Sequence, residues 1–273
     1  MNNANQPSKD KQAEKLLREV LSYKPASFYT EKYKHREPVI DSLPTLTWKE
    51  IASSPLDDRI YTTEKLFLKI AYRDNTPFLV GRSFTDIVRE NYGNKDVVRP
   101  FITFPYRHES MEKGFWFYEH NILPLITLED LRLSTTIAAK YDIDSFISSM
   151  ESAKRFLPAL SKLLPVNALK EIRIIDTSFD LNFLFSYADP SKYTLILGQP
   201  DCGALAEACP ELLLQKKLVF HVDDNTLLEP MKNTLCTRLF LLPTPLFRYE
   251  TGIATHRVEA TCSCKNADTV MLD

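Results

Sequence analysis

Short apolar runs alternate with amphipathic helical segments over residues 101–197, and this alternation is the strongest constraint on the fold. The runs at residues 145–148, 172–175 and 193–197 have the length of strands. Between the first two, residues 150–164 place their apolar side chains on one helical face. Strands separated by helices are typical of parallel βαβ units. The sequence therefore predicts an α/β fold with a mostly parallel sheet and flanking helices.

The pattern changes after residue 217, where short apolar runs follow one another with turns between them and no helical segment. We expect a smaller β-rich subdomain over residues 217–273. It would follow an α/β body over residues 11–216 and a disordered tail over residues 1–10.

Local patterns predict further elements near the N-terminus. Residues 11–23 repeat apolar side chains at helical spacing, which predicts an amphipathic helix. Thr47 and Glu50 have the spacing of a capping box at the start of a short helix. Residues 66–72 and 78–80 are expected to pair as two strands.

Composition excludes several classes of protein. The net charge of −2 and the pI of about 6.2 give no reason to expect a nucleic-acid or anionic-membrane partner. The first fifteen residues are polar, unlike a secretory signal, and no apolar run is long enough to span a bilayer. An odd number of cysteines, five, favours free thiols or metal ligands in a reducing cytosol. We therefore expect a cytoplasmic protein.

Glycine is scarce, with six residues in a chain of 273. A loop that wraps phosphates needs residues without side chains, so that backbone N–H groups can approach the ligand. No segment of this sequence is rich in glycine. The scarcity therefore predicts that no phosphate-binding loop exists, although a general drift away from glycine is the alternative.

Seven short segments occur in the order in which an enzyme family has them. They read SFY at 27–29, IDSLP at 40–44, GQPDCG at 198–203, FHVDD at 220–224, LEP at 228–230, PLFRYETG at 245–252 and CSC at 262–264. Together they resemble the phenylacetate–CoA ligase branch of the adenylate-forming, or AMP-binding, enzymes, and the resemblance is densest over residues 165–266. It implies the fold of that family's large domain, without the C-terminal lid domain that carries a catalytic lysine.

The resemblance also implies where a nucleotide site would lie, and the chain departs from the pattern there. The phosphate loop would fall at residues 71–77, which read AYRDNTP and lack glycine. The magnesium carboxylate would be Asp201, and the ribose-binding carboxylate is replaced by Ile253. Gly198, Asp201 and Arg248 are the remaining positions of a degenerate site. Arg248 would bind phosphate or, alternatively, form a local salt bridge.

A set of metal-ligating residues survives in the same region. Cys209, His221, Cys262 and Cys264 stand where relatives in this branch hold a structural zinc, with Cys209 expected after a helix and His221 at the end of a strand. Three thiolates and one imidazole form a closed tetrahedral site suited to zinc. Four unrelated, mostly buried side chains are the alternative.

Three functions follow from these observations. The first is a homologue without ligase activity, a pseudoenzyme, that binds a protein partner or a small carboxylic acid. The second is a divergent AMP-forming acid–CoA or acyl-carrier ligase that uses ATP and Mg²⁺ and is completed by a separate lid. The third is an unrelated α/β protein whose motif matches are coincidental. The loss of residues that stabilise the charge of adenylation favours the first.

Overall fold

Two compact units make up the chain. The first comprises Met1–Asp86, Pro200–Leu205 and His221–Asp273, and the second comprises Ile87–Gln199 and Ala206–Phe220. The computed structural model describes residues 6–23, 27–34, 36–61, 66–74, 76–89, 93, 96–126, 130–240, 242–264 and 268–273. Residues 1–86 thus group with the C-terminal residues, whereas the sequence analysis assigned residues 11–86 to the α/β body.

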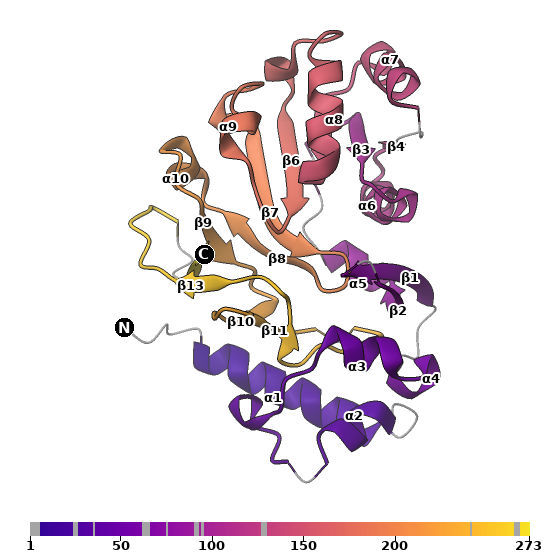
Figure 1. The fold of residues 1–273 in the computed structure, drawn as a ribbon, viewed down its shortest axis with the longest axis vertical. Coiled ribbons are helices and arrows are strands. Elements are labelled where there is room, and N and C mark those ends of the chain that lie inside the picture. Colours follow the sequence, from indigo (N-terminus) through magenta and orange to yellow (C-terminus); the bar gives the residue numbers. More distant parts are fainter. Residues whose placement is uncertain are drawn as a thin grey trace. The chain divides into compact units, whose positions relative to one another are not determined.

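The second unit is built on parallel strands (Figure 1). Its strand order is β9-β8-β7-β6-β5-β3-β4, and the neighbours from β7 to β4 pair in parallel. The strands are β3 (Pro100–Thr103), β4 (Leu125–Ile126), β5 (Ser145–Ser148), β6 (Glu171–Asp176), β7 (Tyr193–Gln199), β8 (Gly203–Ala208) and β9 (Val219–Val222). The boundary between the units falls inside β8 and β9. The predicted mostly parallel sheet is confirmed.

Helices connect and flank these strands, as the alternation predicted. They are α5 (Phe84–Arg89), which crosses the unit boundary, α6 (Arg107–Glu119), α7 (Leu131–Tyr141), α8 (Met150–Leu160), α9 (Leu181–Leu184) and α10 (Pro210–Leu214), with 3₁₀ turns at Val166–Ala168 and Pro190–Lys192. Helix α8 begins where Ser149 caps the backbone N–H of Ser152. Its apolar face is buried, and the ring of Phe156 meets that of Phe101 on β3 edge-on.

Asp144 fixes the start of β5. Its carboxylate accepts hydrogen bonds from the backbone N–H groups of Val98 (2.9 Å) and Arg99 (2.8 Å). It also pairs with Lys170 at 2.9 Å. Burial alone would raise the pKa of Asp144, but these hydrogen bonds and the charge of Lys170 lower it.

We expect Asp144→Asn to lower the free energy of unfolding by about 1–3 kcal/mol at neutral pH, because the backbone N–H groups of Val98 and Arg99 lose a charged acceptor. Since the folded-state pKa is depressed, the contribution is full above the unfolded pKa of about 3.9 and is lost as the pH falls. Urea unfolding at several pH values measures this. The control is Asp142→Asn, at a carboxylate that is 80% exposed. An equal loss of unfolding free energy in Asp144→Asn and Asp142→Asn would contradict the role assigned to Asp144.

The first unit combines N-terminal helices with small antiparallel sheets. Its elements are α1 (Gln6–Ser22), α2 (Ser27–Lys32), a 3₁₀ turn (Ile40–Ser42), α3 (Trp48–Ser53), α4 (Leu56–Arg59), β1 (Leu66–Arg73), β2 (Thr76–Ser83), β10 (Thr226–Glu229), β11 (Leu235–Arg238), β12 (Tyr249–Glu250), β13 (Thr255–Arg257) and β14 (Thr269–Leu272). Strands β10, β11 and β12 form an antiparallel sheet, while β1 pairs with β2 and β13 with β14. None of the described helices is long and apolar enough to cross a membrane.

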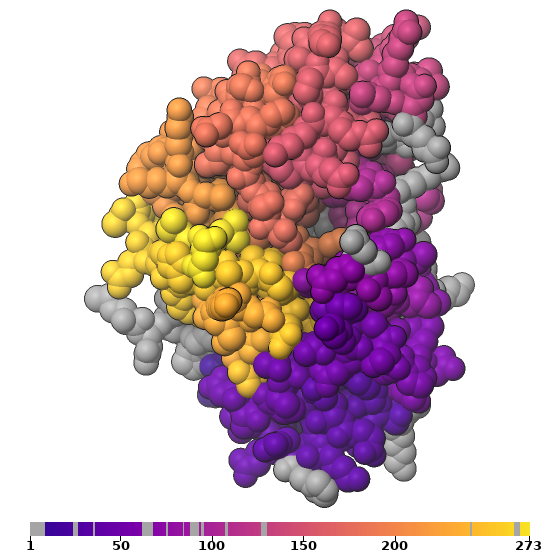
Figure 2. All heavy atoms as spheres, viewed as in Figure 1, coloured from indigo at the N-terminus to yellow at the C-terminus, as the bar shows by residue number. Residues whose placement is uncertain are grey.

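Helix α1 begins at Gln6, inside the segment interpreted as a disordered tail. Lys9, only 8% exposed, donates to the carbonyl groups of Thr226 (2.9 Å) and Asp223 (3.2 Å). Gln12 donates to the carbonyl group of Leu239. In Figure 2 the indigo N-terminal atoms lie directly against the orange and yellow C-terminal ones. These long-range contacts extend the helix beyond its predicted start.

Two local predictions for the first unit are confirmed. Thr47 and Glu50 form a reciprocal capping box at the start of α3. Strands β1 and β2 pair in register from Leu66 opposite Ser83 to Arg73 opposite Thr76. Residues 71–73 and 76–77 therefore lie opposite one another at the end of this strand pair, and Asp74 is in the left-handed region at φ 48°.

Candidate functional site

Asp201 lies in the turn that joins β7 to β8, and its carboxylate is almost fully buried. Arg73, at the end of β1, meets it with two nitrogen atoms: Nε lies 3.0 Å from Oδ2, and Nη2 lies 3.4 Å from Oδ1. The side chain of Asp201 is 2% exposed, and that of Arg73 is 14% exposed. This geometry is that of a two-point arginine–carboxylate pair, which is stronger and more directional than a single ionic contact.

Three further groups complete this cluster. The hydroxyl of Tyr249 donates to Oδ2 of Asp201, and Nη1 of Arg73 donates to the carbonyl oxygen of Thr251. Gly252 has φ +72°, and a Cβ atom there would lie 2.6 Å from Nη1 of Arg73. Glycine is therefore needed at 252, both for the backbone conformation and for the close approach of the guanidinium.

Electrostatics keep Arg73 charged and Tyr249 neutral. Burial is the largest influence on Arg73 and acts to lower its pKa, but the charge and hydrogen bond of Asp201, together with Cys202 and Tyr249, raise that pKa overall. Burial and then the charge of Asp201 raise the pKa of Tyr249 well above its ordinary value. The phenol therefore stays protonated and remains a hydrogen-bond donor to the carboxylate.

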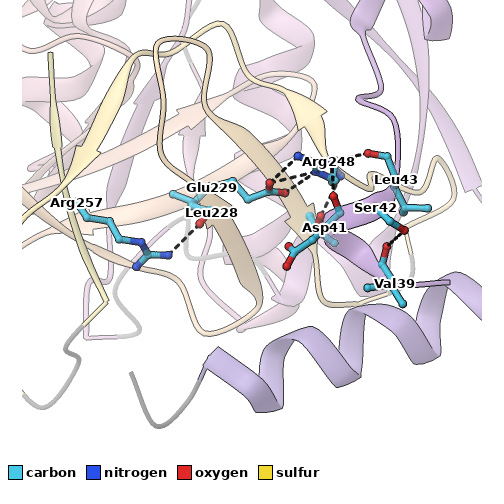
Figure 3. Close-up of polar contacts among 9 residues, drawn as sticks. Val39, Asp41, Ser42, Leu43, Leu228, Glu229, Arg248 and Arg257 are labelled. Carbon is cyan, nitrogen blue, oxygen red and sulfur yellow. Dashed lines mark hydrogen bonds and ion pairs between the residues drawn. The ribbon is translucent and has the colours of Figure 1, made fainter. Parts of the chain in front are cut away.

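Arg248 forms a separate cluster, shown in Figure 3. Its Nε lies 2.9 Å and 3.1 Å from the two carboxylate oxygens of Glu229, and its Nη2 lies 2.9 Å from Oε2. Its Nη1 donates to the carbonyl groups of Leu43 and, at 3.2 Å, Asp41. All three guanidinium nitrogens are thus engaged within the first unit. The local salt bridge, one of the two roles considered for Arg248, is the one observed.

The backbone of Arg248 is also constrained. It has φ 45°, in the left-handed region that disfavours residues with a side chain. Its N–H donates to the hydroxyl of Thr237 at 2.9 Å, and its carbonyl accepts from Leu46 at 3.0 Å. Arg248 therefore ties the segment around Leu43 to β10 and β11, which is a structural role.

The other positions of the expected nucleotide site carry little polar chemistry. Gly198 is a buried residue within β7 in the second unit. Ile253 is 5% exposed, and its backbone N–H donates to the hydroxyl of Thr251. The buried side chain of Ile253 has no group that could accept a hydrogen bond from a ribose hydroxyl.

Four residues form a cluster that could hold a metal ion, as the sequence predicted. The ligand atoms of Cys209, His221, Cys262 and Cys264 all lie within 4.8 Å of one another. His221 is in β9, and the two later cysteines are in the loop between β13 and β14. Cys209 caps α10 and follows strand β8, which corrects the expectation that it follows a helix.

Backbone hydrogen bonds bring these ligands together. The N–H of Val222, next to His221, donates to the carbonyl of Asp268 at 2.9 Å, which ties the cysteine loop to β9. The N–H of Cys209 donates to the carbonyl of Val219, two residues before His221, at 2.7 Å. Cys209, and Asp268 at the end of the cysteine loop, are therefore held against β9.

One distance within the cluster matches the ligand spacing of a tetrahedral zinc site. In a tetrahedral site with Zn–S near 2.3 Å and Zn–N near 2.05 Å, sulfur and nitrogen ligands lie roughly 3.5 Å apart. Sγ of Cys262 lies 3.6 Å from Nε2 of His221. Soft thiolate ligands with one imidazole select zinc over calcium or magnesium, which prefer oxygen ligands.

The sequence analysis did not assign a role to Arg73 or Tyr249. The available signal was charge: the expected phosphate loop carries a cation, Arg73, while the expected magnesium position keeps an acid, Asp201. Their pairing could not be deduced, since the residues are 128 positions apart in the chain.

No protein-family model matches the chain, and no curated protein sequence is similar to it. Solved structures are similar in fold. The chain superposes on a 2-hydroxyisobutyryl-CoA ligase in the postadenylation state, in complex with 2-HIB-AMP, with a TM-score of 0.71 and 12% identity. The match covers 96% of this chain and 65% of the ligase, so the chain spans less than two thirds of that relative.

Two further structures extend the comparison. An open conformation of the same ligase, with 2-HIB-AMP and CoA, gives a TM-score of 0.63 at 12% identity over 98% of this chain and 74% of the ligase. The luciferase-like enzyme of the nonluminescent mealworm Zophobas morio gives 0.52 at 14% identity over 82% of this chain and 60% of that enzyme. The described fold is therefore that of adenylate-forming enzyme domains.

Proposed function

We propose that this chain is a degenerate member of the phenylacetate–CoA ligase branch of the adenylate-forming enzymes, without ATP-dependent ligase activity. In this proposal it acts as a binding or accessory protein for a protein partner or a small carboxylic acid. The fold similarity to a ligase crystallised with an acyl-adenylate supports the superfamily, and the ordered sequence motifs support the branch. Fold alone does not determine the reaction, so the argument for lost activity rests on the site.

The observation that carries the proposal is the ion pair of Arg73 with Asp201. Mg²⁺ is bound through carboxylate oxygens and nucleotide phosphates, so the carboxylate must be available to the ion. Here both oxygens of Asp201 already accept hydrogen bonds from a buried guanidinium, and Tyr249 adds a third. Separating a buried pair costs about 3–5 kcal/mol, a cost that nucleotide binding would have to overcome.

Arg248 supports the same conclusion. A phosphate-binding arginine needs free N–H donors, but Glu229 and two backbone carbonyl groups occupy the donors of Arg248. A carboxylate directly against this guanidinium would also repel a phosphate. Neither charged position of the expected nucleotide site is thus available in the first unit.

We further propose that Cys209, His221, Cys262 and Cys264 bind one structural zinc ion. All four ligands come from protein, which leaves no open position for a substrate or a reactive water molecule, as in structural zinc sites. Zinc bound by His221 on β9 and by Cys262 and Cys264 would hold the loop of the two cysteines against that strand.

The alternative function is a divergent AMP-forming acid–CoA or acyl-carrier ligase, completed by a separate lid. The observation that favours it is the similarity over 96% of this chain to a ligase observed with 2-HIB-AMP. In this case Asp201 would have to exchange Arg73 for Mg²⁺ when nucleotide binds.

Calorimetric titration of the purified, metal-replete protein with ATP–Mg²⁺, and separately with AMP, distinguishes the two functions. We expect no heat of binding and no thermal shift at millimolar nucleotide, because Asp201 and Arg248 are already paired. Micromolar binding that disappears in Asp201→Asn would contradict the proposal and lead to a screen of carboxylic acids for pyrophosphate release. The control variant is Asp74→Asn, at an exposed carboxylate that directly follows β1.

A further inference from the structure

Arg59 is a buried cation that has no acidic partner in the part of the chain that the structure describes. It ends α4 in the first unit and is 3% exposed. Its Nη1 donates to the carbonyl oxygen of Leu79 at 2.5 Å, while its Nε is buried without a hydrogen-bond partner. Among the described residues, no carboxylate forms an ion pair with it. Buried arginines are almost always paired, so this one needs an explanation.

The guanidinium remains charged despite its surroundings. Burial lowers the pKa of Arg59, and Tyr29 is the group that acts in the opposite direction. An arginine nevertheless stays protonated at any pH at which a protein is folded. The carbonyl group of Leu79 satisfies one N–H donor but does not neutralise the charge. Among the described residues, therefore, no negative charge compensates that of Arg59.

Tyr29, on the neighbouring helix α2, presents a second unsatisfied group. Its side chain is fully buried, and its hydroxyl has no hydrogen-bond partner. Burial and then Tyr33 raise the pKa of Tyr29 well above its ordinary value, so the phenol is neutral and can donate a hydrogen bond. Helices α2 and α4 pack against each other, and Tyr29 interacts electrostatically with Arg59. Two buried donors thus share one region.

The other polar groups near this region are engaged elsewhere. The hydroxyl of Tyr33 donates to the carbonyl oxygen of Phe247 at 3.2 Å. The carboxylate of Glu50 pairs with Lys32 and closes the capping box with Thr47. Neither of these groups satisfies Arg59 or Tyr29.

We propose that Arg59 and Tyr29 bind a small inorganic anion of the chloride class between α2 and α4. A water molecule could accept hydrogen bonds from both donors but would leave the charge of Arg59 uncompensated. An anion satisfies both requirements. With two donors and almost complete burial, the site suits a halide, whereas a phosphate would need more donors. This inference does not depend on the proposed function.

The test compares thermal unfolding in sodium chloride, sodium bromide and sodium gluconate at equal ionic strength. Because a ligand that binds only the folded state stabilises it, we expect the midpoint to rise in halide relative to gluconate. The rise in the midpoint should level off at high halide concentration, and we expect it to reach roughly 2–4 °C for a chain of this size. Crystals grown in bromide should show anomalous scattering between Nε of Arg59 and the hydroxyl of Tyr29.

Three variants make the test specific. Tyr29→Phe removes only the hydroxyl and should reduce the halide effect, and Arg59→Gln should abolish it. Arg36→Gln, at an exposed arginine of the same unit, should retain the full effect. If Arg59→Gln fails to fold, the halide effect in Tyr29→Phe and the anomalous signal of bromide in wild-type crystals still test the proposal. A buried water molecule in place of bromide, or equal stability in halide and gluconate, would overturn the proposal.

Discussion

Serine substitution of both Cys262 and Cys264 is expected to release the bound metal and to lower the free energy of unfolding by about 3–4 kcal/mol. The reason is linkage: an ion that binds only the folded chain stabilises it by this amount when free metal exceeds the dissociation constant 100- to 1,000-fold. Removing half of a four-ligand zinc site eliminates most of that binding energy. Plasma emission spectrometry measures the metal, and urea unfolding measures the stability.

The matched control is Cys236→Ala, at a buried thiol on β11 outside the metal-ligand cluster. It should keep one metal ion per chain, although deleting a buried thiol has its own cost in packing. Wild-type protein that was never exposed to chelator provides the reference value. Clearly less than one metal ion per wild-type chain would rule out the zinc proposal.

The second large effect is expected at the buried ion pair in the first unit. Arg73→Met should lower the free energy of unfolding by about 3–5 kcal/mol, because it leaves the carboxylate of Asp201 buried without a cation. Removal of an exposed arginine, as in Arg36→Met, should change it by no more than about 0.5 kcal/mol. Urea denaturation monitored by tryptophan fluorescence gives both values.

A double-mutant cycle tests whether the two side chains act as a pair. Arg73→Met combined with Asp201→Leu should be less destabilised than the sum of the single variants, since replacing a whole buried pair by apolar groups is often nearly neutral. The hydroxyl of Tyr249 then loses its acceptor, so recovery should be incomplete. If the double variant loses as much unfolding free energy as the two single variants together, the pair does not contribute as a unit.

Features that depend on neighbouring residues could be predicted from the sequence. The capping box of Thr47 and Glu50 forms between residues three positions apart, and the structure contains it. Strand β5 covers the same residues as the run predicted at 145–148. The metal-ligand cluster was also predicted, but there the resemblance to a family supplied the grouping of Cys209 with the other three ligands.

Predictions that depended on long-range pairing were less accurate. Cys209 was expected to follow a helix, but the residues before it, 203–208, form strand β8, because small apolar residues fit a buried strand as well as a helix. Strands β13 and β14 were not expected, since a short strand is stabilised by its partner more than by its own residues.

By itself, the sequence determined the α/β class and the mostly parallel sheet, because hydrophobic periodicity acts over short distances. The four candidate metal ligands were grouped by the resemblance to a family. Only the tertiary structure decided what the charged residues do. It pairs Asp201 with Arg73, Arg248 with Glu229, and leaves Arg59 without an acid. A charge interacts with whatever the fold brings within a few ångströms, in a buried region where water cannot screen it. That proximity depends on the packing of the whole unit, which no local pattern specifies.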